Sequence, residues 1–109
     1  MFVRCAYFEG IVAEADRVEF DAGIREGVLP AMARFPKVRH VQALFGREYQ
    51  EGAPDFQVVL RHGYDSLEDL HAALESPARE GVWAELDKIM PLFSGRVIHV
   101  NYETVTLQP

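Results

Sequence analysis

Apolar residues alternate with polar or smaller residues in four short segments of the chain. These segments are residues 2–9, 37–50, 56–64 and 96–105, and they are rich in β-branched and aromatic residues. A repeat of two residues is typical of a strand whose two faces meet different surroundings. The sequence therefore predicts four strands.

Two other segments repeat their apolar residues at helical spacing. The apolar positions are Phe20, Ile24, Val28, Met32 and Phe35 in the first segment, and Leu67, Leu70, Leu74, Val82, Trp83, Leu86, Ile89 and Met90 in the second. Such spacing places the apolar side chains on one face of a helix. The resulting order, β-α-β-β-α-β, predicts an α+β, ferredoxin-like domain with four antiparallel strands and two helices on one face.

Capping residues and prolines mark where the helices begin and end. Ser66 and Asp69 have the spacing of a capping box at the start of the second helix. Proline lacks an N–H and disfavours helical geometry in the residue before it. We therefore expect Pro30 to kink or divide the first helix, Pro36 to end it, and Pro91 to end the second.

The alternation divides the predicted sheet into two faces. The nearly apolar set, which we assign to the helices, contains Val3, Cys5, Tyr7, Val41, Ala43, Phe45, Phe56, Val58, Leu60, His62, Tyr64, Ile98, Val100 and Tyr102. The mixed set contains Arg4, Ala6, Phe8, His40, Gln42, Leu44, Gln57, Val59, Arg61, Val97, His99 and Asn101. A mixed face suits a half-buried interface with a second sheet, and a solvated amphipathic face is the alternative. We prefer the interface, because exposed apolar patches usually have a function.

Length and charge narrow the class of protein. The 109 residues predict one domain, residues 1–109, large enough to fold without metals or disulfides. A net charge of −6 argues against nucleic acid and anionic membranes as partners. No apolar run is long enough to span a bilayer, and we see no signal peptide. With Cys5 as the only cysteine, we expect a cytoplasmic protein.

Two strings resemble the EthD (ethyl tert-butyl ether degradation) family of the dimeric α/β-barrel superfamily. Pro30-x5-Pro36-x-Val38-Arg39 resembles the end of the family's first helix and its second strand. APDFQVVLRHGYDSLEDLHAALESP, residues 53–77, resembles its third strand and following helix. The resemblance covers most of residues 2–105. It implies a homodimer whose two sheets meet in a barrel, with a pocket between sheet and helices in each subunit.

The chain departs from the family pattern at three positions. A His often lies two residues before the first proline in the family, and Val28 lies there in this chain. Lys37 replaces the usual glycine after the second proline, and Arg61 stands at a frequently acidic position of the third strand. Because valine can neither donate, accept nor coordinate, a mechanism that depends on that His is not carried over.

His62 is the strongest catalytic candidate, because it lies on the apolar set near Tyr64. A neutral His in an apolar pocket can act as a general base, with Tyr7, Tyr64 and Trp83 as ligand-binding neighbours. The alternative is a core His that is bonded to backbone or to tyrosine. A cavity of about 300 Å3 or more reached by His62 would favour catalysis.

The remaining candidates favour structural roles. His40 and His99 fall on the mixed set and are expected to bond across the dimer, with a role as polar ligands in the barrel interior as the alternative. Arg4, Gln42, Arg61 and Asn101 share that predicted dimer face. The four His residues lack a metal-binding spacing, so we expect neither a metal nor another cofactor. Haem ligation by a lone His is the alternative, and no accompanying motif supports it. Cys5 is interpreted as a small buried hydrophobe.

Two functional hypotheses follow from the residues and the resemblance. The first is a cofactor-independent oxygenase, isomerase or cyclase that acts on a small apolar or aromatic metabolite. The second is a dimer that binds such a ligand, or serves a degradation pathway, without turnover.

Overall fold

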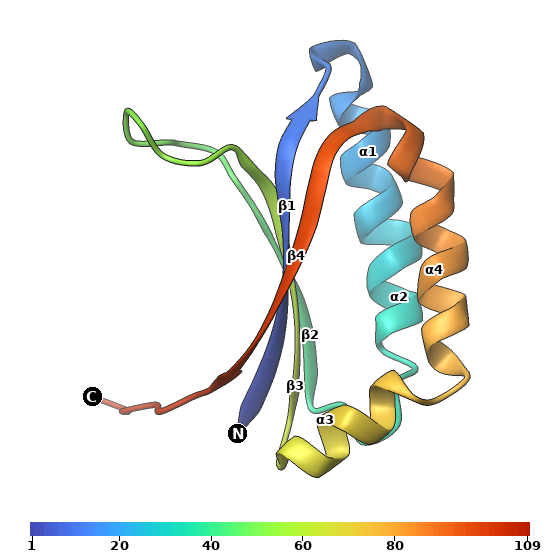
Figure 1. The fold of residues 1–109 in the computed structure, drawn as a ribbon, viewed down its shortest axis with the longest axis vertical. Helices are drawn as coiled ribbons and strands as arrows, with labels where there is room; N and C mark the ends of the chain where they lie inside the picture. The colour runs from blue at the N-terminus through green and yellow to red at the C-terminus, as the bar shows by residue number, and fades with distance from the viewer.

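The computed structural model describes residues 1–109 and contains one four-stranded antiparallel sheet with its helices on one side (Figure 1). The strands are β1 (Phe2–Val12), β2 (His40–Phe45), β3 (Phe56–Tyr64) and β4 (Phe93–Glu103), in the order β2-β3-β1-β4. The helices are α1 (Arg17–Gly23), α2 (Leu29–Met32), α3 (Leu67–Leu74) and α4 (Ala78–Ile89), with short turns η1 (Glu14–Asp16), η2 (Ile24–Val28) and η3 (Met90–Leu92). The predicted ferredoxin-like α+β class is confirmed. None of the helices combines the length and the hydrophobicity needed to cross a bilayer.

The first helix passes through Pro30 without breaking. The turn η2, Ile24–Val28, is a π-helical turn, and α2 follows it directly. A wider turn relieves the clash between the proline ring and the carbonyl four residues earlier, and it needs no N–H from Pro30. The division that we predicted at Pro30 therefore takes the form of a widened turn, and the five predicted apolar positions of this segment are all buried.

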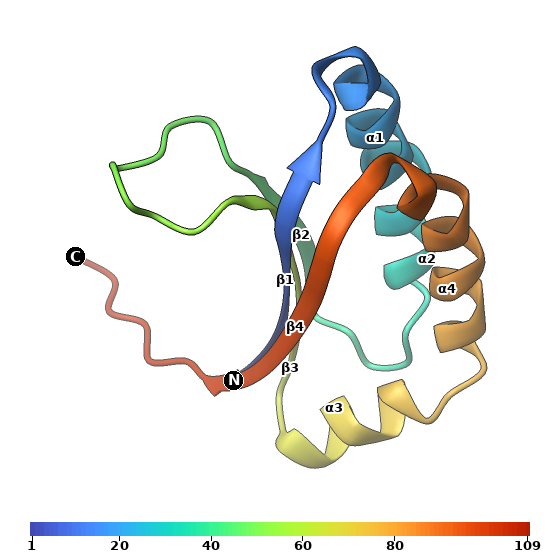
Figure 2. The ribbon, with the colours of Figure 1, turned by 45° about the horizontal axis from the view of Figure 1, so that its top comes forward.

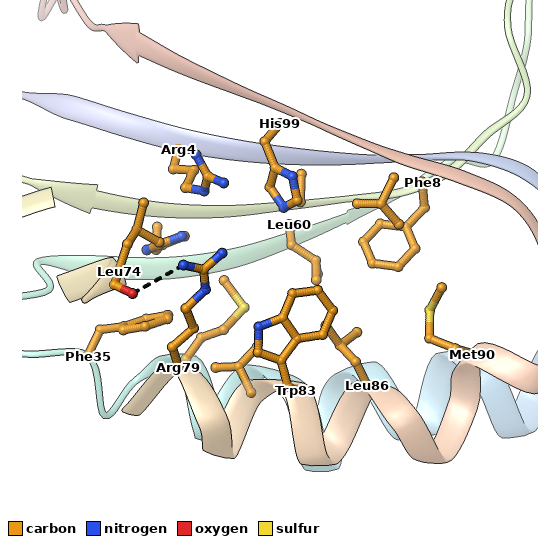
Figure 3. A pocket seen from close by; sticks show the side chains of 15 residues that line it. Arg4, Phe8, Phe35, Leu60, Leu74, Arg79, Trp83, Leu86, Met90 and His99 are labelled. Atoms are coloured by element: carbon orange, nitrogen blue, oxygen red, sulfur yellow. Dashed lines mark hydrogen bonds between the residues drawn. The ribbon is translucent and has the colours of Figure 1, made fainter. Parts of the chain in front are cut away.

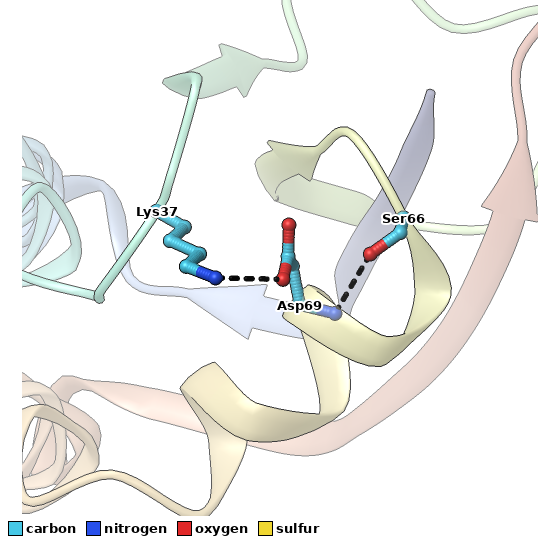
Figure 4. A network of polar contacts seen from close by, with 3 residues as sticks. All are labelled: Lys37, Ser66 and Asp69. Atoms are coloured by element: carbon cyan, nitrogen blue, oxygen red, sulfur yellow. Dashed lines mark hydrogen bonds and ion pairs between the residues drawn. The ribbon is translucent and has the colours of Figure 1, made fainter.

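The turn after α2 is held by α3 (Figure 4). The backbone N–H of Asp69 donates to Ser66 Oγ over 3.0 Å, which confirms Ser66 as the N-cap of α3. The carboxylate of Asp69 also lies 3.5 Å from Lys37 Nζ. Lys37 has a φ of 62°, in the left-handed region that glycine adopts most readily. Lys37 thus adopts a backbone conformation that glycine favours.

β2 is shorter than the predicted strand of residues 37–50. It spans His40–Phe45 and pairs with Val58–Gly63 of β3. The backbone N–H of Gly46 still donates to the carbonyl of Gln57 over 3.2 Å, and the chain then leaves the sheet. Residues 46–55 form a loop that projects from the sheet on the side opposite the helices (Figure 2). The hydroxyl of Tyr49 donates to the carbonyl of Phe56 over 2.5 Å and fixes the base of this loop.

The pairing of the strands shows which side chains face the helices. Arg4 of β1 lies opposite His62 of β3 and opposite Asn101 of β4. Directly opposed residues of antiparallel strands share a face. Arg4 and His62 both line a pocket that the helices cover, so their face is the helix side of the sheet. This side comprises Phe2, Arg4, Ala6, Phe8, Val41, Ala43, Phe45, Val58, Leu60, His62, Tyr64, Val97, His99 and Asn101.

The predicted division of faces is therefore correct for β2 and for β3 from Val58 onward, and wrong for β1, β4 and Phe56. Alternation groups the residues of one strand, but it does not relate one strand to the next. We matched the strands by hydrophobicity, and β1 carries Arg4 rather than an apolar residue toward the helices. Phe56 is displaced by a bulge, since Phe8 pairs with Val58 while Glu9 pairs with Phe56.

Candidate functional site

A pocket lies between the helix side of the sheet and α4 (Figure 3). Its volume is about 100 Å3. Eleven of its fifteen lining residues are hydrophobic. The lining is Arg4, Ala6, Phe8, Met32, Phe35, Leu60, His62, Leu74, Arg79, Val82, Trp83, Leu86, Met90, Val97 and His99. The space is smaller than the ~300 Å3 or more of a typical small-molecule site. It approaches the roughly 150 Å3 of an apolar cavity that holds benzene.

His62 lies at the wall of this pocket, near the end of β3. Its side chain is buried, with 6% of its surface exposed, and its ring stacks on Phe35 with 4.9 Å between the ring centroids. Burial above all, and then the positive charge of Arg4 and the nearby His99 and His40, together lower the pKa of His62 to about 4. The imidazole is therefore neutral near pH 7 and only weakly basic.

The neighbour of His62 determines which ring nitrogen carries the proton. The hydroxyl of Tyr64 lies 2.6 Å from His62 Nδ1, and this is its only hydrogen-bond partner. Tyr64 is fully buried, and burial raises its pKa, so its hydroxyl proton must be donated within the protein. Nδ1 is then the acceptor, and Nε2 carries the ring proton. His62 Nε2 has no partner in the protein and is not fully enclosed, so it offers an N–H donor to the pocket.

Two arginines and a second histidine form the polar end of the pocket. Arg4 donates to Asn101 Oδ1 over 3.0 Å, and Arg79 to the carbonyl of Leu74 over 3.4 Å. The pKa of Arg4 is lowered by burial and by the positive charge of Arg79. Burial and both arginines lower the pKa of His99. These shifts indicate cationic groups close enough to repel one another.

Trp83 covers the pocket from α4. Its side chain rises from the helix toward the sheet, while Arg4 and His99 descend from the strands (Figure 3). It is 47% exposed, although it lines an apolar space. As the only tryptophan of the chain, it provides an optical signal at that space.

The structure brings together part of the predicted ligand site. His62 and Trp83 line the pocket, and Tyr64 lies directly behind His62. The prediction for Tyr7 is wrong, because Tyr7 lies on the opposite side of the sheet. There its hydroxyl is 2.7 Å from the hydroxyl of Tyr102, and its ring lies 5.4 Å from that of Phe56.

The six residues of the predicted dimer face do not all lie on one side of the sheet. His40, Gln42 and Arg61 lie on the outer face, the side of the sheet away from the helices. Arg4, His99 and Asn101, which we had assigned to the same face, lie on the helix side instead. The cause is again the register of the two pairings that β1 makes, with β3 and with β4, which hydrophobicity alone does not reveal.

Arg79 was not identified from the sequence. It lies four residues before Trp83 on α4, and this spacing places both side chains on one helix face. That spacing was the available signal. Val28, at the family's His position, is fully buried in the core and does not line the pocket.

Other chemistries find less support in the structure. Cys5 is buried on the outer face, and burial raises the pKa of its thiol, which disfavours the thiolate. No group of three or more His, Cys, Asp or Glu side chains is arranged to hold a metal ion.

Several solved structures share the fold of this chain. An EthD family protein from Bacillus halodurans superposes with a TM-score of 0.71 at 18% identity, covering 96% of this chain and 100% of that one. A mutant of SnoaB, a cofactor-independent oxygenase from Streptomyces nogalater, gives 0.67 at 17% identity, with 99% and 96% covered. A dimeric protein of unknown function and ferredoxin-like fold from Bacteroides fragilis gives 0.66 at 17% identity, with 94% and 95% covered.

The sequence matches no family model and no curated protein. The chain therefore has the ferredoxin-like βαββαβ fold of these proteins, and its resemblance to the EthD family is confirmed at the level of that fold.

Proposed function

We propose that this chain is an EthD-like homodimer that binds a small apolar or aromatic metabolite in its pocket and acts on it without a cofactor. The reaction class is oxygenation, isomerisation or cyclisation. The observation that carries the proposal is an apolar pocket lined by two arginines and by the neutral His62, which is hydrogen-bonded to Tyr64 behind it. The shared fold with a cofactor-independent oxygenase supports the reaction class.

The arrangement supports stabilisation of an anionic intermediate. Oxygenation, isomerisation and cyclisation of such metabolites commonly pass through an enolate or phenolate, and its proton would pass to water because no lining residue is a carboxylate. In a water-poor site, fixed donors and cations aimed at the developing charge supply much of the rate enhancement. His62 Nε2–H would donate to that oxygen, and Arg4 and Arg79 would balance its charge. A pKa of about 4 disfavours His62 as a base at neutral pH, so we assign it the donor role.

The outer face supports the proposed dimer. Leu44, Val100 and Tyr102 on this face are each about 40% exposed, and Arg61 has a buried Nε without a partner. Residues 46–55 and 104–109 project from the sheet on that same side (Figures 1 and 2). A second sheet packed against this face would cover the apolar side chains, and the projecting segments would flank it.

A dimer that binds a ligand without turnover is the second candidate. Three observations favour it: a pocket of about 100 Å3, below the ~300 Å3 that would favour catalysis, the weak basicity of His62, and the valine at position 28. The last two remove a base that an enzyme of this kind could use.

The two candidates separate in a screen followed by a turnover assay. A metabolite library is screened by thermal shift against the wild type, His62→Gln and the exposed control His71→Gln. Compounds that stabilise the wild type and His71→Gln but not His62→Gln identify ligands of this pocket. Oxygen uptake or a new product from such a compound, lost in His62→Gln, supports the enzyme. Shifts that are identical in all three proteins would remove His62 from the binding site.

A further inference from the structure

We infer that the ligand of this pocket is a small acid, with an apolar body of about one ring and a carboxylate that binds between Arg4 and Arg79. The inference rests on the proposed function and names its substrate class. The charge around the pocket differs from the charge of the protein as a whole.

The pocket is cationic in an acidic protein. The chain has a net charge of −6, yet none of the fifteen lining residues is acidic. The five ion pairs of the molecule use other cations, so Arg4 and Arg79 have no carboxylate within 4.0 Å. Two guanidiniums without a counter-ion beside an apolar space repel each other, and Arg4 is also partly buried. An anion between them relieves the repulsion and supplies a counter-charge to Arg4.

The cations of the pocket gather toward one end. Arg4 and Arg79 lie there with Leu74 and Phe35 beside them, and Phe8, Leu86 and Met90 lie toward the other end, which carries no charge (Figure 3). A ligand that fills this space must therefore be amphipathic, with its charged group toward the arginines. A volume of about 100 Å3 limits its apolar body to about one ring.

The arginines fit a planar carboxylate. Each guanidinium makes only one hydrogen bond within the protein, Arg4 to Asn101 and Arg79 to Leu74, so most of its donors remain free. Arg presents paired donors that match the two oxygens of a carboxylate. The Nε2–H of His62 supplies a further neutral donor at the pocket wall.

The test measures binding through Trp83, whose fluorescence reports on this pocket and requires no turnover. Benzoate and phenylacetate are titrated beside benzamide and phenylacetamide, which keep the shape and lack the charge. We expect at least one acid to bind about tenfold or more tightly than its amide, as charge-assisted hydrogen bonds predict. We also expect 0.5 M NaCl to weaken the binding of the acid and to leave the binding of its amide unchanged.

Single substitutions test whether Arg4 and Arg79 are the residues that bind the carboxylate. Arg79→Gln should weaken the binding of the acid about tenfold and leave its amide unchanged, and Arg4→Gln should act in the same way. Arg34→Gln, which removes an exposed arginine outside the pocket, should bind both probes like the wild type. The inference is overturned if no acid binds more tightly than its amide, or if no acid binds at all. It is also overturned if Arg34→Gln weakens the binding of the acid as much as Arg79→Gln does. The outcome is independent of catalysis and dimerisation, because a monomer or an inactive dimer would still show the preference.

Discussion

Acidification should destabilise this protein through His62. In the folded chain the pKa of His62 is lowered from 6.5 to about 4, first by burial and then by Arg4, His99 and His40. The unfolded chain takes up the same proton near pH 6.5. Between these two values the unfolded state binds more protons, so the free energy of unfolding falls as the pH falls. The contribution of His62 is fully present above about pH 6.5 and is lost toward pH 4.

The size of the effect follows from the two pKa values. The gap between 6.5 and about 4 corresponds to on the order of 3 kcal/mol, and His62 is too buried for solvent to screen much of it. Tyr64 adds to the cost of protonation, because its hydroxyl donates to the nitrogen that would have to take the proton. His99 titrates in the same direction, since burial also lowers its pKa, so a variant is needed to isolate His62.

Urea unfolding at pH 7 and pH 4.5 provides the assay, with the wild type beside His62→Gln and His71→Gln. We expect the wild type to lose on the order of 2–3 kcal/mol more than His62→Gln between the two pH values. His71→Gln, which changes an exposed histidine, should follow the wild type. Equal losses in the wild type and in His62→Gln would refute the reasoning. So would an NMR titration in which His62 takes up its proton near pH 6.5.

Three further predictions concern single side chains. Tyr64→Phe leaves His62 Nδ1 buried without a partner and should lower stability by about 1–3 kcal/mol, measured by urea unfolding, and unchanged stability would contradict the hydrogen bond. Lys37→Gly should raise stability by about 1 kcal/mol, or the Tm by about 4 °C or more, because glycine adopts the positive φ without strain; a lower Tm would mean that the Asp69 ion pair matters more. Val100→Asp should convert the proposed dimer to a monomer in sedimentation equilibrium, and an unchanged mass would exclude Val100 from the interface.

Much of the fold could be predicted from periodicity and caps. The bounds of β3, 56–64, and the cap at Ser66 are correct because both signals are local in sequence. The relative facing of β1 and β3 could not be predicted in this way. It depends on Arg4 lying opposite His62, which is a property of pairing between strands distant in sequence.

In the candidate site, too, residues could be predicted from the pattern of their own strand or helix, but not from the way distant strands pair. His62, Tyr64 and Trp83 were named from the character of their own strand or helix. Arg4 was assigned to the wrong side because a charged residue is rare beneath helices, and this one is accommodated by a pocket that no sequence pattern reveals. Tyr7 failed for the complementary reason: an aromatic residue was taken as core, although it lies on the outer face.

The arrangement of the sheet has a consequence for how the chain folds. β1 is an inner strand of the sheet, and β4 is the edge strand beside it. They pair from Phe2 opposite Glu103 to Val12 opposite Phe93, so this pairing brings together segments from the two ends of the described chain. Closing so large a loop costs entropy before any of the contacts form, and such distant pairings slow folding. During synthesis, β1 must wait beside β3 with one edge unpaired until β4 has emerged, and for that interval its backbone is open to association with other chains.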